Sequence, residues 1–168
     1  LAAFEDPGMV ILPTHREIVR VNGASIAAFA RELQKRFAVE RLEGGSSAEA
    51  RALERLRAIP YSENAFVVAL KGERDLWIVR RPVVHSPHGS VTEGLDVTVL
   101  HRVILGDTLE AAGGREPEIA YSPDPVPLFA RVRKGAADAA LFMRPMLASQ
   151  MEAACLAGEL LPQKSTYF

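Results

Sequence analysis

The sequence contains a single cysteine, Cys155, among its 168 residues. One thiol cannot form a disulfide within the chain, and it cannot supply the paired thiolates of a zinc site. Inside a predicted helix, a lone cysteine is more typical of a small apolar side chain than of a nucleophile. We therefore expect Cys155 to be buried and inert.

Long apolar runs and an excess of one charge are also missing. No apolar stretch approaches the length that crosses a bilayer, and no signal-peptide pattern is present, so we expect a cytoplasmic protein without a membrane partner. The 20 Lys and Arg residues nearly balance the 21 Asp and Glu residues, which leaves a formal net charge of -1. A protein that binds nucleic acid through its phosphates needs surplus cations, so the balance disfavours that class of partner.

Several signatures of enzyme chemistry are absent as well. The chain has no Gly-x-Ser-x-Gly elbow and no dinucleotide-binding glycine pattern. His85 and His88 stand three residues apart in a proline-rich loop, but no nearby Cys or third His completes a set of metal ligands. We therefore predict no metal site.

What the sequence does contain is the pattern of one ordinary globular domain. Hydrophobic residues make up 48% and charged residues 24%, which is enough to form a core in a chain of this length. Helical spacing of apolar residues predicts helices over about 26–37, 46–57, 95–109, 124–134 and 147–157. Ser46 and Glu49 predict a capping box at the second of these helices.

Strand-like runs lie between the predicted helices, at 9–21, 38–42, 65–70, 76–80, 118–121 and 139–143. The polar turn Lys71-Gly72-Glu73-Arg74-Asp75 joins two of them as a hairpin, and Pro13 interrupts the first. These elements predict an α+β fold (mixed α/β): a mixed β-sheet that contains a hairpin, with helices packed on it.

Four short motifs follow one another along the chain: Leu12-Pro-Thr-His-Arg16, Leu95-Asp-Val-Thr-Val-Leu-His101, Asp138-Ala-Ala-Leu-Phe-Met-Arg-Pro145 and Leu161-Pro-Gln-Lys-Ser-Thr-Tyr-Phe168. The set resembles the C-terminal part of the domain-of-unknown-function 1015 family. These are large intracellular proteins often labelled ParB-like. The resemblance covers most of the chain from Leu12 onward.

The resemblance implies an N-terminal half that this chain does not contain. In the family, that half carries an Asp-Gly-His-His-Arg motif similar to one in ParB-like proteins and in a free-serine kinase. None of the four histidines of this chain stands beside another, so the motif is absent here. Because the chain starts at Leu1, we expect residues 1–168 to be one domain of a larger protein. Its own N-terminal half is the first expected partner, and a second copy of the chain is another.

Thr14, His15 and Arg16 are the first candidate site residues. On a strand, Thr14 and Arg16 point to one face and His15 to the other. A Thr and an Arg side by side can hold a phosphate or a carboxylate, because the guanidinium binds such groups through two parallel hydrogen bonds. The alternative is an edge strand with solvated polar side chains.

Lys164, Ser165 and Thr166 form the second candidate. A Lys beside two hydroxyls is typical of phosphate-binding loops, but the glycine-rich run of such a loop is missing. The same residues can simply end the domain, with the hydroxyls capping main-chain amides.

Arg144, Asp96 and His101 complete the candidates. Arg144 closes an apolar strand, where it either reaches a ligand crevice or pairs with Asp138 or Glu118. Asp96 and His101 are weaker candidates, since residues five apart share no helix face. Asp96 fits the first turn of a helix, and His101 fits a packing role.

The family resemblance, with Arg16, Arg144 and Lys164 as candidate phosphate or substrate contacts, implies a functional hypothesis in which this domain is the accessory, ligand-contacting half of a nucleotide-dependent phosphoryl transferase that acts on a small metabolite. The whole protein would use ADP or ATP with Mg²⁺ and show kinase-like activity, while this fragment alone would be inactive. The main alternative is a non-catalytic interaction or assembly domain. ParB-like nucleic-acid binding ranks last because of the balanced charge.

Overall fold

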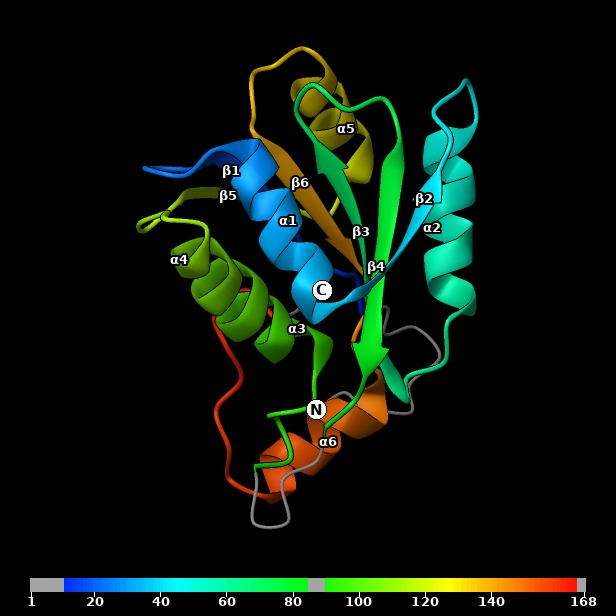
Figure 1. Cartoon of the computed structure of the whole chain (residues 1–168). Helices are drawn as coiled ribbons and strands as arrows, with labels where there is room; N and C mark the ends of the chain where they lie inside the picture. The colour runs from blue at the N-terminus through cyan, green and yellow to red at the C-terminus, as the bar shows by residue number, and fades with distance from the viewer. Residues whose placement is uncertain (1–10, 85–89, 166–168) are drawn as a thin grey trace.

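Six strands form one sheet in the computed structural model, which describes residues 11–84 and 90–165 (Figure 1). The strands are β1 (His15–Arg20), β2 (Ala38–Leu42), β3 (Glu63–Leu70), β4 (Leu76–Pro82), β5 (Glu118–Ser122) and β6 (Ala139–Met143). They lie in the order β2-β4-β3-β6-β1-β5, and each neighbouring pair is antiparallel. The α+β class and the β3–β4 hairpin are confirmed. The expected mixture of parallel and antiparallel strands is not found among the described pairings.

Helices cover both faces of the sheet. They are α1 (Ile26–Arg36), α2 (Ala48–Ala58), α3 (Asp96–Val99), the π-helical segment η1 (Leu100–Thr108), α4 (Leu109–Ala111), α5 (Pro125–Arg133) and α6 (Ala148–Leu156). The helix α1 and the continuous stretch α3–η1–α4 pack on one face, and α2 and α5 pack on the other. The helix α6 lies beyond one end of the sheet (Figure 1).

The two cores follow from the two-residue alternation of the strands. The first core, under α1 and η1, takes the larger side chains of β3, namely Phe66, Val68 and Leu70. The second core, under α2 and α5, takes the smaller ones, Ala65, Val67 and Ala69. Full burial of a side chain such as Phe66 stabilises the fold by roughly 1.5–3 kcal/mol, so each face of the sheet needs its helices.

Two helix starts match the predicted chemistry and one does not. Ser25 Oγ accepts from the amide of Ala28 at 3.1 Å, and Asp124 Oδ1 accepts from the amide of Val126 at 3.0 Å. The capping box predicted at Ser46 is wrong, because α2 begins one residue later, after Ser47, and makes no side-chain cap bond there.

The prediction for Cys155 is also wrong, since its side chain is exposed. The helix α6 turns Met151 and Ala154 towards the protein, and the residue after Ala154 points away from that face. Within the described residues, no helix is both long enough and apolar enough to cross a membrane.

A carboxylate fixes the end of α6 to the turn that leads into α3. Glu159 accepts hydrogen bonds from Ser90 Oγ, from the amides of Val91 and Thr92 at 3.0 Å each, and from Thr92 Oγ1 at 2.9 Å. The bond from Ser90, followed by those from Thr92 and Val91, lowers the pKa of Glu159 to about 2. This contact holds the chain in place just before α3 and η1, which carry Asp96, Thr98 and His101.

Candidate functional site

The first polar cluster, the Arg16 cluster, gathers around the guanidinium of Arg16 on β1. Arg16 is fully buried, and its Nη2 atom donates to His101 Nε2 at 3.0 Å and to the carbonyl of Lys164 at 2.9 Å. Its Nη1 atom donates to the carbonyl of Thr14 and contacts Met143 Sδ at 3.0 Å. The cluster therefore unites four of the residues that the sequence singled out, from three distant parts of the chain.

The Arg16 cluster is unusual because no carboxylate among the described residues faces the buried cation. Burial lowers the pKa of Arg16 to about 10. Burial, followed by the charge of Arg16, lowers the pKa of His101 to about 4. His101 is thus a neutral acceptor at Nε2, which places its proton on Nδ1.

Lys164 contributes its main chain to this cluster, since its side chain is exposed. Ser165 is buried and its hydroxyl donates to the carbonyl of Pro162, so it bonds a main-chain carbonyl and not the main-chain amide that the structural alternative expected. Thr166 lies outside the described residues, as do His85 and His88. Through the Lys164 carbonyl, the stretch that follows α6 therefore lies against Arg16.

His15 points to the opposite face from Arg16, as the strand alternation predicts. Its ring packs against Phe142, with centroids 5.3 Å apart, and its Nδ1 atom accepts from the amide of Met143 at 3.3 Å. Burial, followed by the charge of Arg16, lowers the pKa of His15 to about 4. His15 is therefore a neutral core histidine that lies away from the Arg16 cluster.

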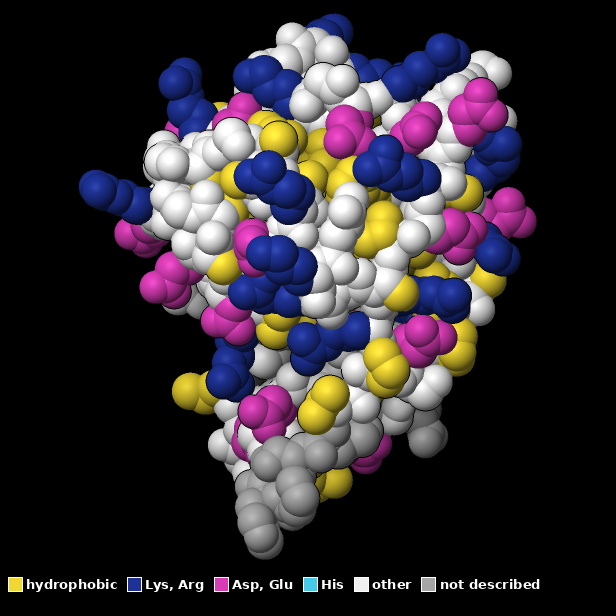
Figure 2. All heavy atoms as spheres, viewed as in Figure 1, with side chains coloured by type: hydrophobic (Ala, Val, Ile, Leu, Met, Phe, Trp, Pro, Cys, Tyr) yellow, Lys and Arg dark blue, Asp and Glu magenta, His cyan; other side chains and the backbone are white. Residues whose placement is uncertain are grey.

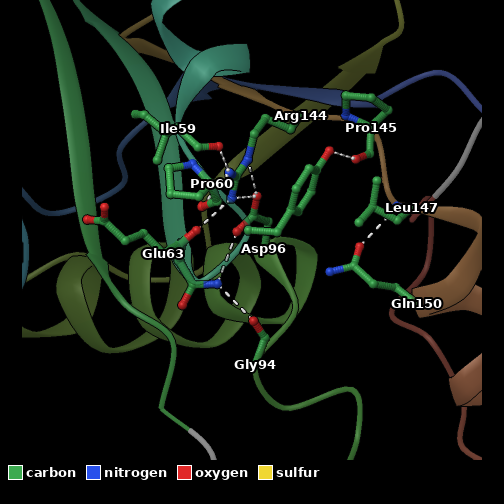
Figure 3. Close-up of polar contacts among 11 residues, drawn as sticks. Ile59, Pro60, Glu63, Gly94, Asp96, Arg144, Pro145, Leu147 and Gln150 are labelled. Carbon is green, nitrogen blue, oxygen red and sulfur yellow. Dashed lines mark hydrogen bonds and ion pairs between the residues drawn. The ribbon is translucent and has the colours of Figure 1, made fainter.

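Arg144, directly after β6, forms the second cluster (Figure 3). Its Nε and Nη2 atoms donate to Asp96 Oδ2 at 3.0 and 2.7 Å. Nη2 also donates to the carbonyl of Glu63 at 2.7 Å, and Nη1 donates to those of Ile59 and Pro60 at 2.7 and 3.1 Å. All donors of this guanidinium are used within the protein. We call this set the Arg144 clasp.

The partner of Arg144 is thus Asp96, and neither Asp138 nor Glu118. Burial raises the pKa of Asp96 against the opposing effect of Arg144. Asp96 Oδ1 also accepts from Asn64 Nδ2 at 3.0 Å, and the guanidinium of Arg144 lies 4.2 Å from the centre of the Tyr61 ring. The clasp joins the end of β6, the start of β3 and the first turn of α3.

A groove of about 340 Å³ opens between α1, the end of β4 and the helix α3–η1. We call it the arginine groove. Its polar lining is Arg36, Arg81, Glu93, Thr98, Arg102 and Asp107. On this face of the molecule, dark blue Lys and Arg side chains stand among magenta Asp and Glu side chains (Figure 2). The volume suits a small metabolite.

Three arginines of the groove differ in how they are paired. Arg36 pairs with Glu32 on its own helix at 2.8 Å, and Arg102 pairs with Glu93 at 3.4 Å. Arg81 has no carboxylate partner among the described residues, and its guanidinium lies 5.7 Å from the centre of the Phe37 ring. Arg81 is therefore the cation of the groove that is available to a ligand.

Unpartnered polar atoms concentrate at this groove. Within the described residues, five buried side-chain atoms have no hydrogen-bond partner. Two of them, Thr14 Oγ1 and Arg16 Nε, belong to the Arg16 cluster. The other three, Thr98 Oγ1, Arg81 Nε and Asn64 Oδ1, belong to residues that line the arginine groove or the hollow beside it. Because such atoms cost about 1–3 kcal/mol each when they stay unpaired, their grouping indicates a missing partner.

Sequence reasoning missed these groove residues. Asn64 and Arg81 lie in different strands and meet only because β3 and β4 pair in the register Asn64↔Arg81. Thr98 lies inside the motif Leu95–His101, but nothing in the sequence assigned it a role. The hairpin register was the one available signal, since directly opposite residues share a face of the sheet.

Comparison with known proteins gives one match. A family model described as "Protein of unknown function (DUF1015)" matches residues 1–98. No curated protein and no solved structure matches the chain. The predicted membership of the DUF1015 family is confirmed. The assignment to the C-terminal part of that family, the four motifs and the ParB-like and kinase-like labels stay predictions, and the motifs at 138–145 and 161–168 lie outside the matched residues.

The Arg144 clasp predicts a large loss of stability on truncation. Arg144→Met leaves the buried carboxylate of Asp96 without its cation, so urea unfolding should show a loss of about 3–5 kcal/mol. Arg133→Met is the control, because it removes an exposed pair with Glu49 and should cost less than about 1 kcal/mol. Equal losses in the two variants would contradict a structural role for Arg144.

His15 and His101 predict a pH dependence of stability. Their folded-state pKa values of about 4 lie below the ordinary value of 6.5. The free energy of unfolding is therefore at its full value above pH 6.5 and decreases as the pH falls towards 4. Between these pH values the two histidines bind protons in the unfolded chain but stay neutral in the folded protein. An NMR titration of the imidazole carbons should give both midpoints near 4. A midpoint near 6.5 for His101 would show that it does not accept a hydrogen bond from Arg16.

Proposed function

Because a family model covers more than half of it, the chain belongs to the DUF1015 family, and from this premise we propose that it binds a small anionic metabolite in the arginine groove. The ligand carries a phosphate or a carboxylate group. One observation carries the proposal: two buried polar atoms without partners among the described residues, Thr98 Oγ1 and Arg81 Nε, belong to residues that line this groove, and a third, Asn64 Oδ1, belongs to the hollow beside it. Arg81 also has no carboxylate partner among the described residues.

The contacts of Arg81 support an anion rather than a neutral ligand. Its guanidinium rests on the ring of Phe37, and its Nε atom is buried and unpaired. A phosphate or carboxylate oxygen would accept from this nitrogen in a charge-assisted hydrogen bond, which is about twice as strong as a neutral one. Thr98 Oγ1 adds a hydroxyl donor in the same groove, and it is almost completely buried.

The remaining arginines support the same ligand through longer-range attraction. Arg36 and Arg102 each have a carboxylate partner, so neither needs a ligand to balance its charge. Three arginines nevertheless line the groove against the two carboxylates of Glu93 and Asp107, so the lining as a whole is net positive, and charges in a partly enclosed groove are screened less than on an open surface. Arg81 and Thr98 are then the residues that contact the anion, and Arg36 and Arg102 favour its approach.

Within a larger protein, this groove would serve as the ligand-contacting part of a nucleotide-dependent phosphoryl transferase. Such reactions depend mainly on positioning and on cations that stabilise the phosphoryl oxygens, which arginines from an accessory domain can supply. ADP or ATP with Mg²⁺ would be bound with the help of the other half of the protein. The Arg16 cluster is the weaker place for a ligand, because Arg16 is fully buried and the Lys164 carbonyl occupies one of its donors.

Arg81→Met should weaken binding of inorganic phosphate to this chain by about ten- to hundredfold, because a hydrogen bond to a charged group contributes about 1.5–3 kcal/mol. Isothermal titration calorimetry measures the effect directly. The control is Arg57→Met, an exposed arginine of α2 on the other side of the sheet. Equal phosphate affinity in the wild type and in Arg81→Met would refute the proposal.

A further inference from the structure

A second hollow of about 150 Å³, the side hollow, lies beside the arginine groove at Arg81. Arg81, Glu93 and Val99 line both spaces, so the two are adjacent. The residues that line only the side hollow are Asn64, Val84 and Gly94, and none of them is charged. A ligand that reaches both spaces therefore meets Arg36 and Arg102 in the groove, whereas the groups that the side hollow adds are neutral.

Asn64 lines the side hollow and has a hydrogen-bond acceptor that is not used within the described residues. Its Nδ2 atom donates to the carbonyl of Gly94 at 2.8 Å and to Asp96 Oδ1 at 3.0 Å. Both of these partners are pure acceptors, so they fix the orientation of the amide and leave Oδ1 as the free atom. Asn64 is 1% exposed, and its Oδ1 atom has no partner among the described residues. The neutral end of the ligand should therefore donate a hydrogen bond.

A hydroxyl fits this position better than an ammonium group. The guanidinium of Arg81 borders the same hollow, so a second cation there would be repelled. The nearby carboxylate of Glu93 is already paired with Arg102 at 3.4 Å, which reduces its attraction for a positive ligand group. A neutral hydroxyl can donate to Asn64 Oδ1, is not repelled by Arg81 and does not depend on attraction by Glu93.

From this arrangement we infer that the ligand is a phosphate ester with free hydroxyl groups, such as a phosphorylated polyol or sugar. Its phosphate binds Arg81 and Thr98 in the arginine groove, and a hydroxyl donates to Asn64 in the side hollow. A phosphate suits the groove end better than a carboxylate, because its oxygens can accept from both residues and still face Arg36 and Arg102. This inference rests on the proposed function and narrows it to one class of metabolite.

The test compares phosphate esters of matched size by calorimetry on the unmodified chain. Glycerol 3-phosphate and propyl phosphate share the phosphate and the three-carbon skeleton, and they differ in the two hydroxyls. Glycerol 3-phosphate should bind about five- to tenfold more tightly, which corresponds to one neutral hydrogen bond to a buried acceptor. Thr98→Val should weaken both esters alike and leave their ratio unchanged, because Thr98 contacts only the phosphate.

Equal binding of the two esters, or tighter binding of propyl phosphate, would overturn the inference. Tighter binding of 3-aminopropyl phosphate than of glycerol 3-phosphate would also overturn it, since it would assign an ammonium group to the side hollow. In each of these cases the proposed function still holds if the chain binds inorganic phosphate, if Arg81→Met weakens that binding and if Arg57→Met leaves it unchanged. Absence of any phosphate binding would remove both.

Discussion

The ion pair between Arg144 and Asp96 is the interaction on which the rest of the molecule depends. It connects the end of the central strand β6 to the first turn of α3. The remaining N–H groups of Arg144 donate to the main-chain carbonyls of Ile59, Pro60 and Glu63. A buried pair of this kind offsets its desolvation only when its other hydrogen bonds are also made. Here the guanidinium is fully satisfied, so the pair fixes where α3 begins and thereby where the helix after it runs.

That helix supplies residues to two separate polar clusters. Thr98, Arg102 and Asp107 line the arginine groove, whereas His101 accepts from Arg16 below it. The stretch from Leu100 to Thr108 is π-helical, and the hydroxyl of Thr108 donates to the carbonyl of Val103, five residues earlier, at 2.6 Å. Wider helical turns of this kind are rare and often lie at functional sites. The winding changes which neighbouring residues face the groove and which face the sheet.

The sequence predicted the elements well because their apolar periodicities are strong. Helix α1 and the β3–β4 hairpin follow from spacing and from a polar turn, and Thr14, Arg16, His101 and Lys164 were identified before the structure brought them together. The antiparallel order of the sheet and the π-helix could not be predicted, because neither has a local signal. The groove was missed for a related reason: Asn64, Arg81 and Thr98 become neighbours only through strand register and helix packing. Arg144 was recognised as a strand-end charge, but its partner depended on where α3 begins.

The central claim is that an anionic ligand binds at Arg81, where the buried polar atoms Arg81 Nε, Thr98 Oγ1 and Asn64 Oδ1 have no partner among the described residues. The most direct test is a two-dimensional NMR titration of the chain with glycerol 3-phosphate, which follows the main-chain amides together with the Asn64 side-chain amide and the Arg81 Nε proton. The account predicts saturable shifts that concentrate at Arg81, Asn64 and residues 93–107. No saturable shifts, or shifts centred on Arg16 and Lys164, would contradict it.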